Sequence, residues 1–287
     1  MPVYPISFSI PESKIIDIVP KKSKPLATNI PGNLKTYIFT TENNFNIDYQ
    51  NSIFGITQKK GGWDCLRHYQ ILANGCIPHF IDLEKCPSTI MTHFPKQIIL
   101  NAMNEAKSAK LDYNITISSL LEYTRNNLTT RKMAEYVLKS INKTPKNILF
   151  LSGRDNPDYL QSLMCIGFKE LYGIDCVEFP KKDLEHIYDD YSNSTELCGK
   201  GFSYTNIIPS NQKTYTPTRD DIKNKKYDLV IYGNAYNERP FWDLVNIYYQ
   251  PSEIVLLCGD DEHDVKNCFV YMHGKYGYHS FIRELEA

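Results

Sequence analysis

The chain has 287 residues, of which 42% are hydrophobic and 23% are charged. This composition is that of a globular protein able to bury a core, and the length suits two domains of average size or one large one. The net charge of −1 provides no overall attraction for nucleic acid or for an anionic membrane surface. No apolar run approaches the roughly 20 residues of a membrane-spanning helix, so we expect neither a nucleic-acid partner nor a transmembrane segment.

The eight cysteines form no CxxC pair and show no zinc-finger spacing. Several of them, such as Cys76, Cys176 and Cys258, stand within apolar stretches and are expected to be small buried side chains. This cysteine usage is typical of a reducing compartment. The first residues contain no basic region followed by an apolar core, so we expect a cytoplasmic location.

The first half of the chain alternates apolar runs with amphipathic stretches. The runs predict strands at 4–10, 36–40, 53–57 and 77–83, with a long loop at 18–34. Helical periodicity predicts helices at 63–74, 95–107, 117–126 and 130–142, and 45–52 is expected to be a short helix or a turn. The segment Lys143–Lys146, which contains Pro145, is the best candidate for a domain boundary.

After this segment the pattern restarts. Strands are expected at 147–151, 176–180, 227–232 and 253–258, helices at 158–172 and 239–249, and a polar loop at 189–217. Strands that alternate with helices indicate a parallel sheet with helices on its faces. We therefore predict an α/β protein of two Rossmann-like domains, 1–145 and 146–287, that face one another across a cleft.

The stretch at 53–83 has the features of an anion-binding site. Its loop, Lys59-Lys60-Gly61-Gly62, joins a strand to a helix, so that backbone N–H groups and the helix N-terminus can face an anion. Lys59, Lys60 and Arg67 would add positive charge where a diphosphate lies. Gly75 stands where a left-handed residue would end the helix. The alternative is a surface turn with solvated lysines.

The segment 59–87, KKGGWDCLRHYQILANGCIPHFIDLEKCP, resembles the donor-site segment of exostosin-like glycosyltransferases of the two-domain GT-B architecture. In such a site an acidic residue five positions before a glycine holds the ribose hydroxyls of a nucleotide sugar. Gln70 occupies this position here, and the usual companion acid falls on Gly62. A glutamine can still exchange hydrogen bonds with hydroxyls, so we expect Gln70 to face the nucleotide.

The second half also resembles this family, through the segments at 148–163, 226–234 and 259–264. In the family these segments precede the donor-site segment, whereas here they follow it. The resemblance therefore implies a circular permutation or a joined pair of fragments.

Three polar loops are predicted at the carboxyl ends of strands, at 58–63, 152–158 and 259–264, where open α/β sheets bind ligands. Trp63 and His68 are expected near the donor, with a place in the core as the alternative for each. The catalytic base is expected among the acids and the histidine of the second and third loops, whose alternative is a solvated acidic surface: Asp155, Asp158, Asp260, Asp261, Glu262 and His263. Among these we favour Asp155, Asp261 and His263.

The resemblance implies transfer of a sugar from a nucleotide-diphosphate donor to a carbohydrate acceptor. No Asp-x-Asp motif and no Gly-x-Gly-x-x-Gly fingerprint occur, so we expect neither a metal nor a dinucleotide cofactor. Two other functions stay open. One is a sugar- or nucleotide-binding protein of the same fold without catalysis, and the other is a nucleotide- or phosphate-binding α/β protein that is not an enzyme.

Overall fold

The computed structural model describes residues 3–153, 158–261, 265 and 268–286. The strands in this part of the chain are β1 (Val3–Pro5), β2 (Lys24–Leu26), β3 (Ser52–Gln58), β4 (Ile77–Ile81), β5 (Ile148–Leu151), β6 (Cys176–Phe179), β7 (Leu229–Tyr232), β8 (Ile254–Cys258) and β9 (His279–Ile282). They form a six-stranded sheet of order β1-β9-β8-β7-β5-β6 and a three-stranded sheet of order β2-β3-β4. Every pairing is parallel, which confirms the predicted α/β class with parallel sheets.

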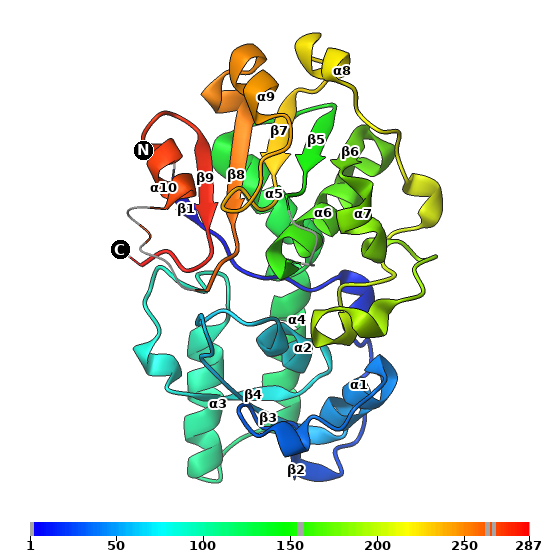
Figure 1. Ribbon diagram of the computed structural model, residues 1–287. Coiled ribbons are helices and arrows are strands. Elements are labelled where there is room, and N and C mark those ends of the chain that lie inside the picture. Colours follow the sequence, from blue (N-terminus) through cyan, green and yellow to red (C-terminus); the bar gives the residue numbers. More distant parts are fainter. Residues whose placement is uncertain (1–2, 154–157, 262–264, 266–267, 287) are drawn as a thin grey trace.

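The α-helices are α1 (Glu42–Gln50), α2 (Leu66–Ala73), α3 (Lys96–Lys107), α4 (Tyr113–Asn127), α5 (Thr130–Ile141), α6 (Tyr159–Tyr172), α7 (Lys181–Leu184), α8 (Arg219–Lys223), α9 (Trp242–Tyr248) and α10 (Phe269–Gly274). In Figure 1 the larger sheet occupies the upper part of the molecule, and the smaller sheet lies below it with α1 to α4. The boundary expected near residue 145 falls between α5 and β5. Strand β1 nevertheless belongs to the larger sheet, because it pairs with β9.

The larger sheet is buried on both faces, as a parallel sheet requires. Along β5, Ile148 and Phe150 point into a cluster that contains α5 and α6, while Leu149 and Leu151 point into a second cluster with α9 and α10. Alternate residues of one strand thus serve two cores, because successive side chains point to opposite faces.

The smaller sheet is covered by α2, which contributes Tyr69 and Leu72 to the core. The helix ends at Gly75, whose φ of +60° lies in the left-handed region that suits glycine. Its start is later than expected. Cys65 is extended and caps the helix, so Trp63 belongs to the preceding loop and not to α2.

Two sequence predictions for short elements were wrong, and some short elements were not predicted at all. Residues 36–40 form no strand; a 3-10 helix spans Leu34–Thr36, and the strand that pairs with β3 is β2, within the expected loop. The first strand ends at Pro5 and not at residue 10. Strand β9 and helix α10 were not predicted. Each of these elements is only three to six residues long, so distant partners decide its conformation more than local pattern does.

The polar segment 189–217 contains only short 3-10 turns and reaches from the larger sheet to the smaller one. The backbone N–H of Ser203 donates to Glu42 Oε1 at 2.9 Å, and Gln70 Nε2 donates to Ser203 Oγ at 3.1 Å. Lys200 Nζ donates to the Phe39 carbonyl at 2.5 Å. The segment therefore joins the two parts of the molecule.

Both ends of this segment are held by a buried ion pair. Lys169 Nζ on α6 lies 2.6 Å from Glu178 Oε2 on β6, and both side chains are almost fully buried. Glu178 also accepts hydrogen bonds from Tyr188 and Thr214, each at 2.7 Å. Burial acts to raise the pKa of Glu178, but the Lys169 charge and the hydrogen bonds from Lys169, Thr214 and Tyr188 together outweigh it, so the pKa is lowered.

We expect Glu178→Gln to lower the free energy of unfolding by about 3–5 kcal/mol, because it leaves the buried Lys169 charge without its partner. Urea denaturation would measure this loss. Asp190→Asn is the matched control, since the Lys213–Asp190 pair is 40% and 50% exposed and should contribute less than about 1 kcal/mol. Equal losses in the two variants would contradict the assignment.

Candidate functional site

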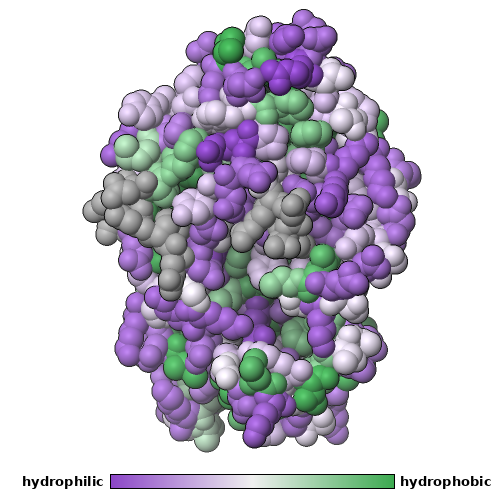
Figure 2. Space-filling view, viewed as in Figure 1, coloured by the Kyte–Doolittle hydropathy of each residue, from purple (hydrophilic) through white to green (hydrophobic). Residues whose placement is uncertain are grey.

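A cavity of about 770 Å³ is lined by residues that follow strands of both sheets. Lys60 follows β3, Asp158 lies in the connection after β5, and Asp260 and Asp261 follow β8. The cavity therefore lies at carboxyl ends of the strands, where open α/β sheets bind ligands. Figure 2 shows that the surface between the upper and lower parts is hollowed near the centre of the view and bordered mainly by hydrophilic residues.

One wall of the cavity is cationic and comes from the first half of the chain. It carries Lys60 and Arg67, and neither forms an ion pair with a carboxylate in the described part of the chain. Arg67 Nη1 donates to the Tyr37 hydroxyl at 3.1 Å, and the guanidinium carbon lies 4.9 Å from the centre of the Tyr37 ring. Two cations without a carboxylate partner make this wall suited to an anion.

An adjoining wall is acidic and comes from the second half of the chain, with Asp261 lying against Gly61 of the loop that carries Lys60. Asp158 caps α6 by accepting from the Gln161 backbone N–H at 3.0 Å, and it also accepts from Asn234 Nδ2 at 3.2 Å. Asp261 forms an ion pair with the buried Arg283, yet its side chain stays 56% exposed. Asp155 and His263, also predicted as catalytic, lie outside the described residues.

Aromatic rings complete the cavity. Phe45 and Phe202 lie beside Gln70, with their ring centres 5.3 Å apart, and Phe8 and Tyr159 form an edge-to-face pair at 6.0 Å. Such flat apolar surfaces can hold a nucleobase or the apolar face of a sugar ring.

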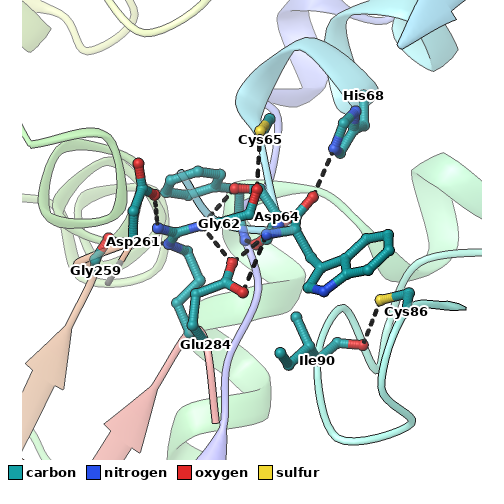
Figure 3. A network of polar contacts seen from close by, with 12 residues as sticks. Gly62, Asp64, Cys65, His68, Cys86, Ile90, Gly259, Asp261 and Glu284 are labelled. Atoms are coloured by element: carbon teal, nitrogen blue, oxygen red, sulfur yellow. Dashed lines mark hydrogen bonds and ion pairs between the residues drawn. The ribbon is translucent and has the colours of Figure 1, made fainter. Parts of the chain in front are cut away.

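Two backbone N–H groups between the glycine loop and α2, in the stretch expected to face a phosphate, bind a carboxylate of the protein itself. Glu284 accepts from the Trp63 N–H at 3.1 Å and from the Asp64 N–H at 2.9 Å. Arg283 Nη1 donates to the same carboxylate at 2.8 Å and also donates to the Asp64 carbonyl. Figure 3 shows Glu284 reaching from the C-terminal segment to the loop of Gly62 and Asp64. These two N–H groups are therefore not available to a phosphate.

This arrangement explains the two glycines of the loop. A Cβ atom at Gly61 would collide with the Asp261 carboxylate, and a Cβ atom at Gly62 would collide with the Glu284 carboxylate. The two glycines thus leave room for the close approach of two acidic side chains.

Two residues expected near a ligand lie in the core instead. His68 is fully buried; its Nε2 donates to the Trp63 carbonyl at 2.8 Å, and its Nδ1 lies 2.8 Å from the Thr57 hydroxyl. Burial lowers the pKa of His68 to about 3, so the ring is neutral. Trp63 is 8% exposed and stacks on Phe80. In Figure 3 His68 lies on α2, away from Asp261 and Glu284.

The remaining predicted donor residues are divided between the cavity and the exterior. Lys60, Arg67 and Gln70 line the cavity, whereas Lys59 is exposed and its Nζ lies 5.5 Å from the centre of the Trp63 ring. Gln70 is 8% exposed, and its amide nitrogen donates to the Phe202 carbonyl at 3.3 Å as well as to Ser203.

Sequence reasoning missed Asp64, which lines the cavity although it is almost fully buried. Its Oδ2 accepts from the Phe8 N–H at 2.6 Å and its Oδ1 from the Tyr69 hydroxyl at 2.8 Å. Burial raises the pKa of Asp64 to about 6, with Arg283 opposing the rise. The signal available in the sequence was an acid immediately before an apolar helix. Arg283 and Glu284 had no comparable signal, because their partners in this loop, Trp63 and Asp64, lie more than 200 residues away.

Within the described ranges, no group of three or more His, Cys, Asp and Glu side chains is arranged to hold a metal ion. No helix in that part of the chain combines the length and apolar character needed to cross a membrane. Comparison of the chain with protein-family models, with curated proteins and with solved structures gave no match.

The raised pKa of Asp64 predicts a pH-dependent stability. Between about pH 4 and pH 6 the folded protein keeps a proton that the unfolded chain has lost, so the free energy of unfolding falls as the pH rises. About two pKa units correspond to about 3 kcal/mol. Asp64→Asn should remove this dependence, whereas Asp17→Asn, at a side chain that is 94% exposed, should retain it. Urea unfolding at both pH values tests this, and an unchanged dependence in Asp64→Asn would contradict it.

Proposed function

We propose that the cavity binds a nucleoside-diphosphate sugar and transfers its sugar to a hydroxyl group of a carbohydrate acceptor. One observation carries this proposal. Two cations without a carboxylate partner in the described chain, Lys60 and Arg67, line one cavity between the two sheets together with the acids Asp260 and Asp261. A leaving diphosphate requires positive groups such as Lys60 and Arg67, and activation of an acceptor hydroxyl requires a carboxylate such as that of Asp261. The proposed architecture is the GT-B arrangement of two Rossmann-like units.

On the donor side, Lys60 and Arg67 neutralise the charge that develops on the leaving diphosphate. Gln70 lies one helical turn beyond Arg67 and faces the same cavity. Its amide nitrogen binds the segment around Ser203, so its amide oxygen is the atom proposed to accept from a ribose hydroxyl. The rings of Phe45 and Phe202 provide the surface for the base.

On the acceptor side, Asp261 is the proposed general base among the described residues. Its carboxylate takes the proton of the acceptor hydroxyl while the oxygen attacks the anomeric carbon, and the bond from that carbon to the diphosphate breaks. Arg283 holds one oxygen of Asp261, which fixes the orientation of the carboxylate. Asp158 is engaged as the cap of α6, which favours a structural role for it.

A nucleotide- or sugar-binding protein without catalysis is the second candidate. Two observations favour it: the ion pair of Asp261 with Arg283, and a glutamine at position 70 where the resembled family has an acid. A thermal-shift screen of sugar nucleotides, followed by measurement of released nucleoside diphosphate, separates the two functions. Stabilisation by a sugar nucleotide with no turnover across a panel of carbohydrate acceptors would support the second candidate.

We expect Arg67→Ala and Lys60→Ala each to weaken nucleoside-diphosphate binding about ten-fold or more, because a charge-assisted contact contributes about 1.5–3 kcal/mol. Isothermal titration calorimetry with uridine, adenosine and guanosine diphosphates would measure the change. Lys59→Ala is the matched control, since this neighbouring lysine does not line the cavity and should leave affinity unchanged. If all three variants bind as the wild type does, the cationic wall is not the diphosphate site.

Asp261→Asn should lower kcat by about 10²–10⁴-fold with little change in the KM for the donor, because the amide cannot accept the acceptor proton. Initial rates with the sugar nucleotide identified by the screen would show this separation. Asp190→Asn, at an exposed carboxylate outside the cavity, is the control. A kcat that stays within two-fold of the wild type in Asp261→Asn would rule out Asp261 as the base.

A further inference from the structure

Among the described residues, Tyr37 is the one whose side chain both accepts a hydrogen bond from Arg67 and places its ring against the Arg67 guanidinium. It follows the 3-10 helix Leu34–Thr36, and its own N–H donates to the Leu34 carbonyl at 3.2 Å. Tyr37 does not line the cavity, whereas Arg67 does. Any effect of Tyr37 on a ligand in the cavity would therefore pass through Arg67.

The backbone on both sides of Tyr37 is fixed. The Thr36 hydroxyl donates to the Asn33 carbonyl at 2.7 Å and accepts from the Ile30 N–H at 2.9 Å. On the other side, the Phe39 carbonyl accepts from Lys200 Nζ, so the stretch is tied to the segment that reaches across from the larger sheet. Tyr37 is thus held by its neighbours independently of Arg67, as a residue that orients another must be.

Arg67 needs such an orienting contact. A long cationic side chain loses much rotamer freedom when it is fixed on a ligand, and the loss is smaller when the guanidinium is already held. Arg67 lacks a carboxylate partner, and its buried Nε has no hydrogen-bond partner in the described chain. In the described chain the guanidinium contacts the ring of Tyr37 and donates from Nη1 to its hydroxyl. Nη2 is therefore left to donate to a further acceptor.

We propose that Tyr37 is a positioning residue that holds the Arg67 guanidinium toward the cavity and thereby sets its affinity for a diphosphate group. The proposal deepens the proposed function and rests on it for the identity of the ligand, but the Tyr37–Arg67 unit can be tested with inorganic pyrophosphate alone.

The ionisation of Tyr37 adds a dependence of anion binding on pH. Partial burial acts to raise the pKa of Tyr37, but the hydrogen bond and charge of Arg67 and the charge of Lys60 outweigh it, so the pKa is lowered. Burial instead raises the pKa of the cavity residues Tyr159 and Tyr191. As the pH rises, Tyr37 is therefore the first of these three to become negative, which neutralises Arg67 and weakens anion binding.

The test is calorimetric titration of the full chain with inorganic pyrophosphate and with uridine, adenosine and guanosine diphosphates. Tyr37→Ala should weaken binding about five- to ten-fold, and Tyr37→Phe, which keeps the ring, about two- to three-fold. In an Arg67→Ala background, Tyr37→Ala should change affinity by less than about 1.5-fold, because its effect passes through Arg67. Tyr276→Phe, at a 67% exposed tyrosine outside the cavity, is the control and should bind as the wild type does.

The pH profile provides a readout that a general loss of stability would not produce. In the wild type the alkaline decline in affinity should begin at lower pH than in Tyr37→Phe, since the lysines are common to both proteins.

The outcomes separate the two proposals. The role of Tyr37 is overturned if Tyr37→Ala leaves diphosphate binding unchanged. It is also overturned if Tyr37→Ala weakens binding as much in the Arg67→Ala background as in the wild type. Either result leaves the proposed function standing. Pyrophosphate binding that depends on Tyr37, without any nucleoside-diphosphate binding, supports that role and overturns the proposed function.

Discussion

The buried guanidinium of Arg283 is the interaction on which the geometry of the cavity depends. It donates to the Gly259 carbonyl at 2.9 Å and to the Asp64 carbonyl, and it pairs with Glu284 and Asp261. A charge without solvent exposure is tolerated only when carboxylates and carbonyls satisfy it. These partners come from three segments far apart in sequence: the glycine loop, the end of β8 and the C-terminal segment. The hydrogen bonds and ion pairs of Arg283 therefore hold both walls of the cavity together.

This network changes the chemistry available for binding an anion. A glycine loop before a helix ordinarily offers its backbone N–H groups to a phosphate. Here those of Trp63 and Asp64 are bound to Glu284, so the positive groups that the described chain turns toward the cavity are the side chains of Lys60 and Arg67. Side chains are mobile where a backbone is not. A cation that is to act as a fixed site therefore needs support, which Arg67 finds in Tyr37.

The polar segment 189–217, which reaches from the larger sheet to the smaller one, supplies the remaining wall of the cavity. It has little regular structure of its own, and its conformation depends on contacts at its ends and its middle. The buried Lys169–Glu178 pair holds the residues where it leaves and rejoins the larger sheet, and Gln70 binds it at Ser203. A change in either contact would alter the shape of the cavity without touching the acids or the cations.

The sequence by itself determined the elements whose pattern is local. The apolar runs of β5 and β8, the periodicity of α6 and the left-handed glycine at position 75 all follow from side-chain spacing or backbone sterics within a few residues. The sequence also placed Lys60, Arg67 and Gln70 at one expected donor site, and all three line the cavity. Only the tertiary structure decided that His68 lies in the core, that β2 and not residues 36–40 joins the smaller sheet, and that Glu284 binds the N–H groups of Trp63 and Asp64. These outcomes depend on partners up to 221 residues away, and neither hydrophobic period nor turn chemistry carries information over that distance.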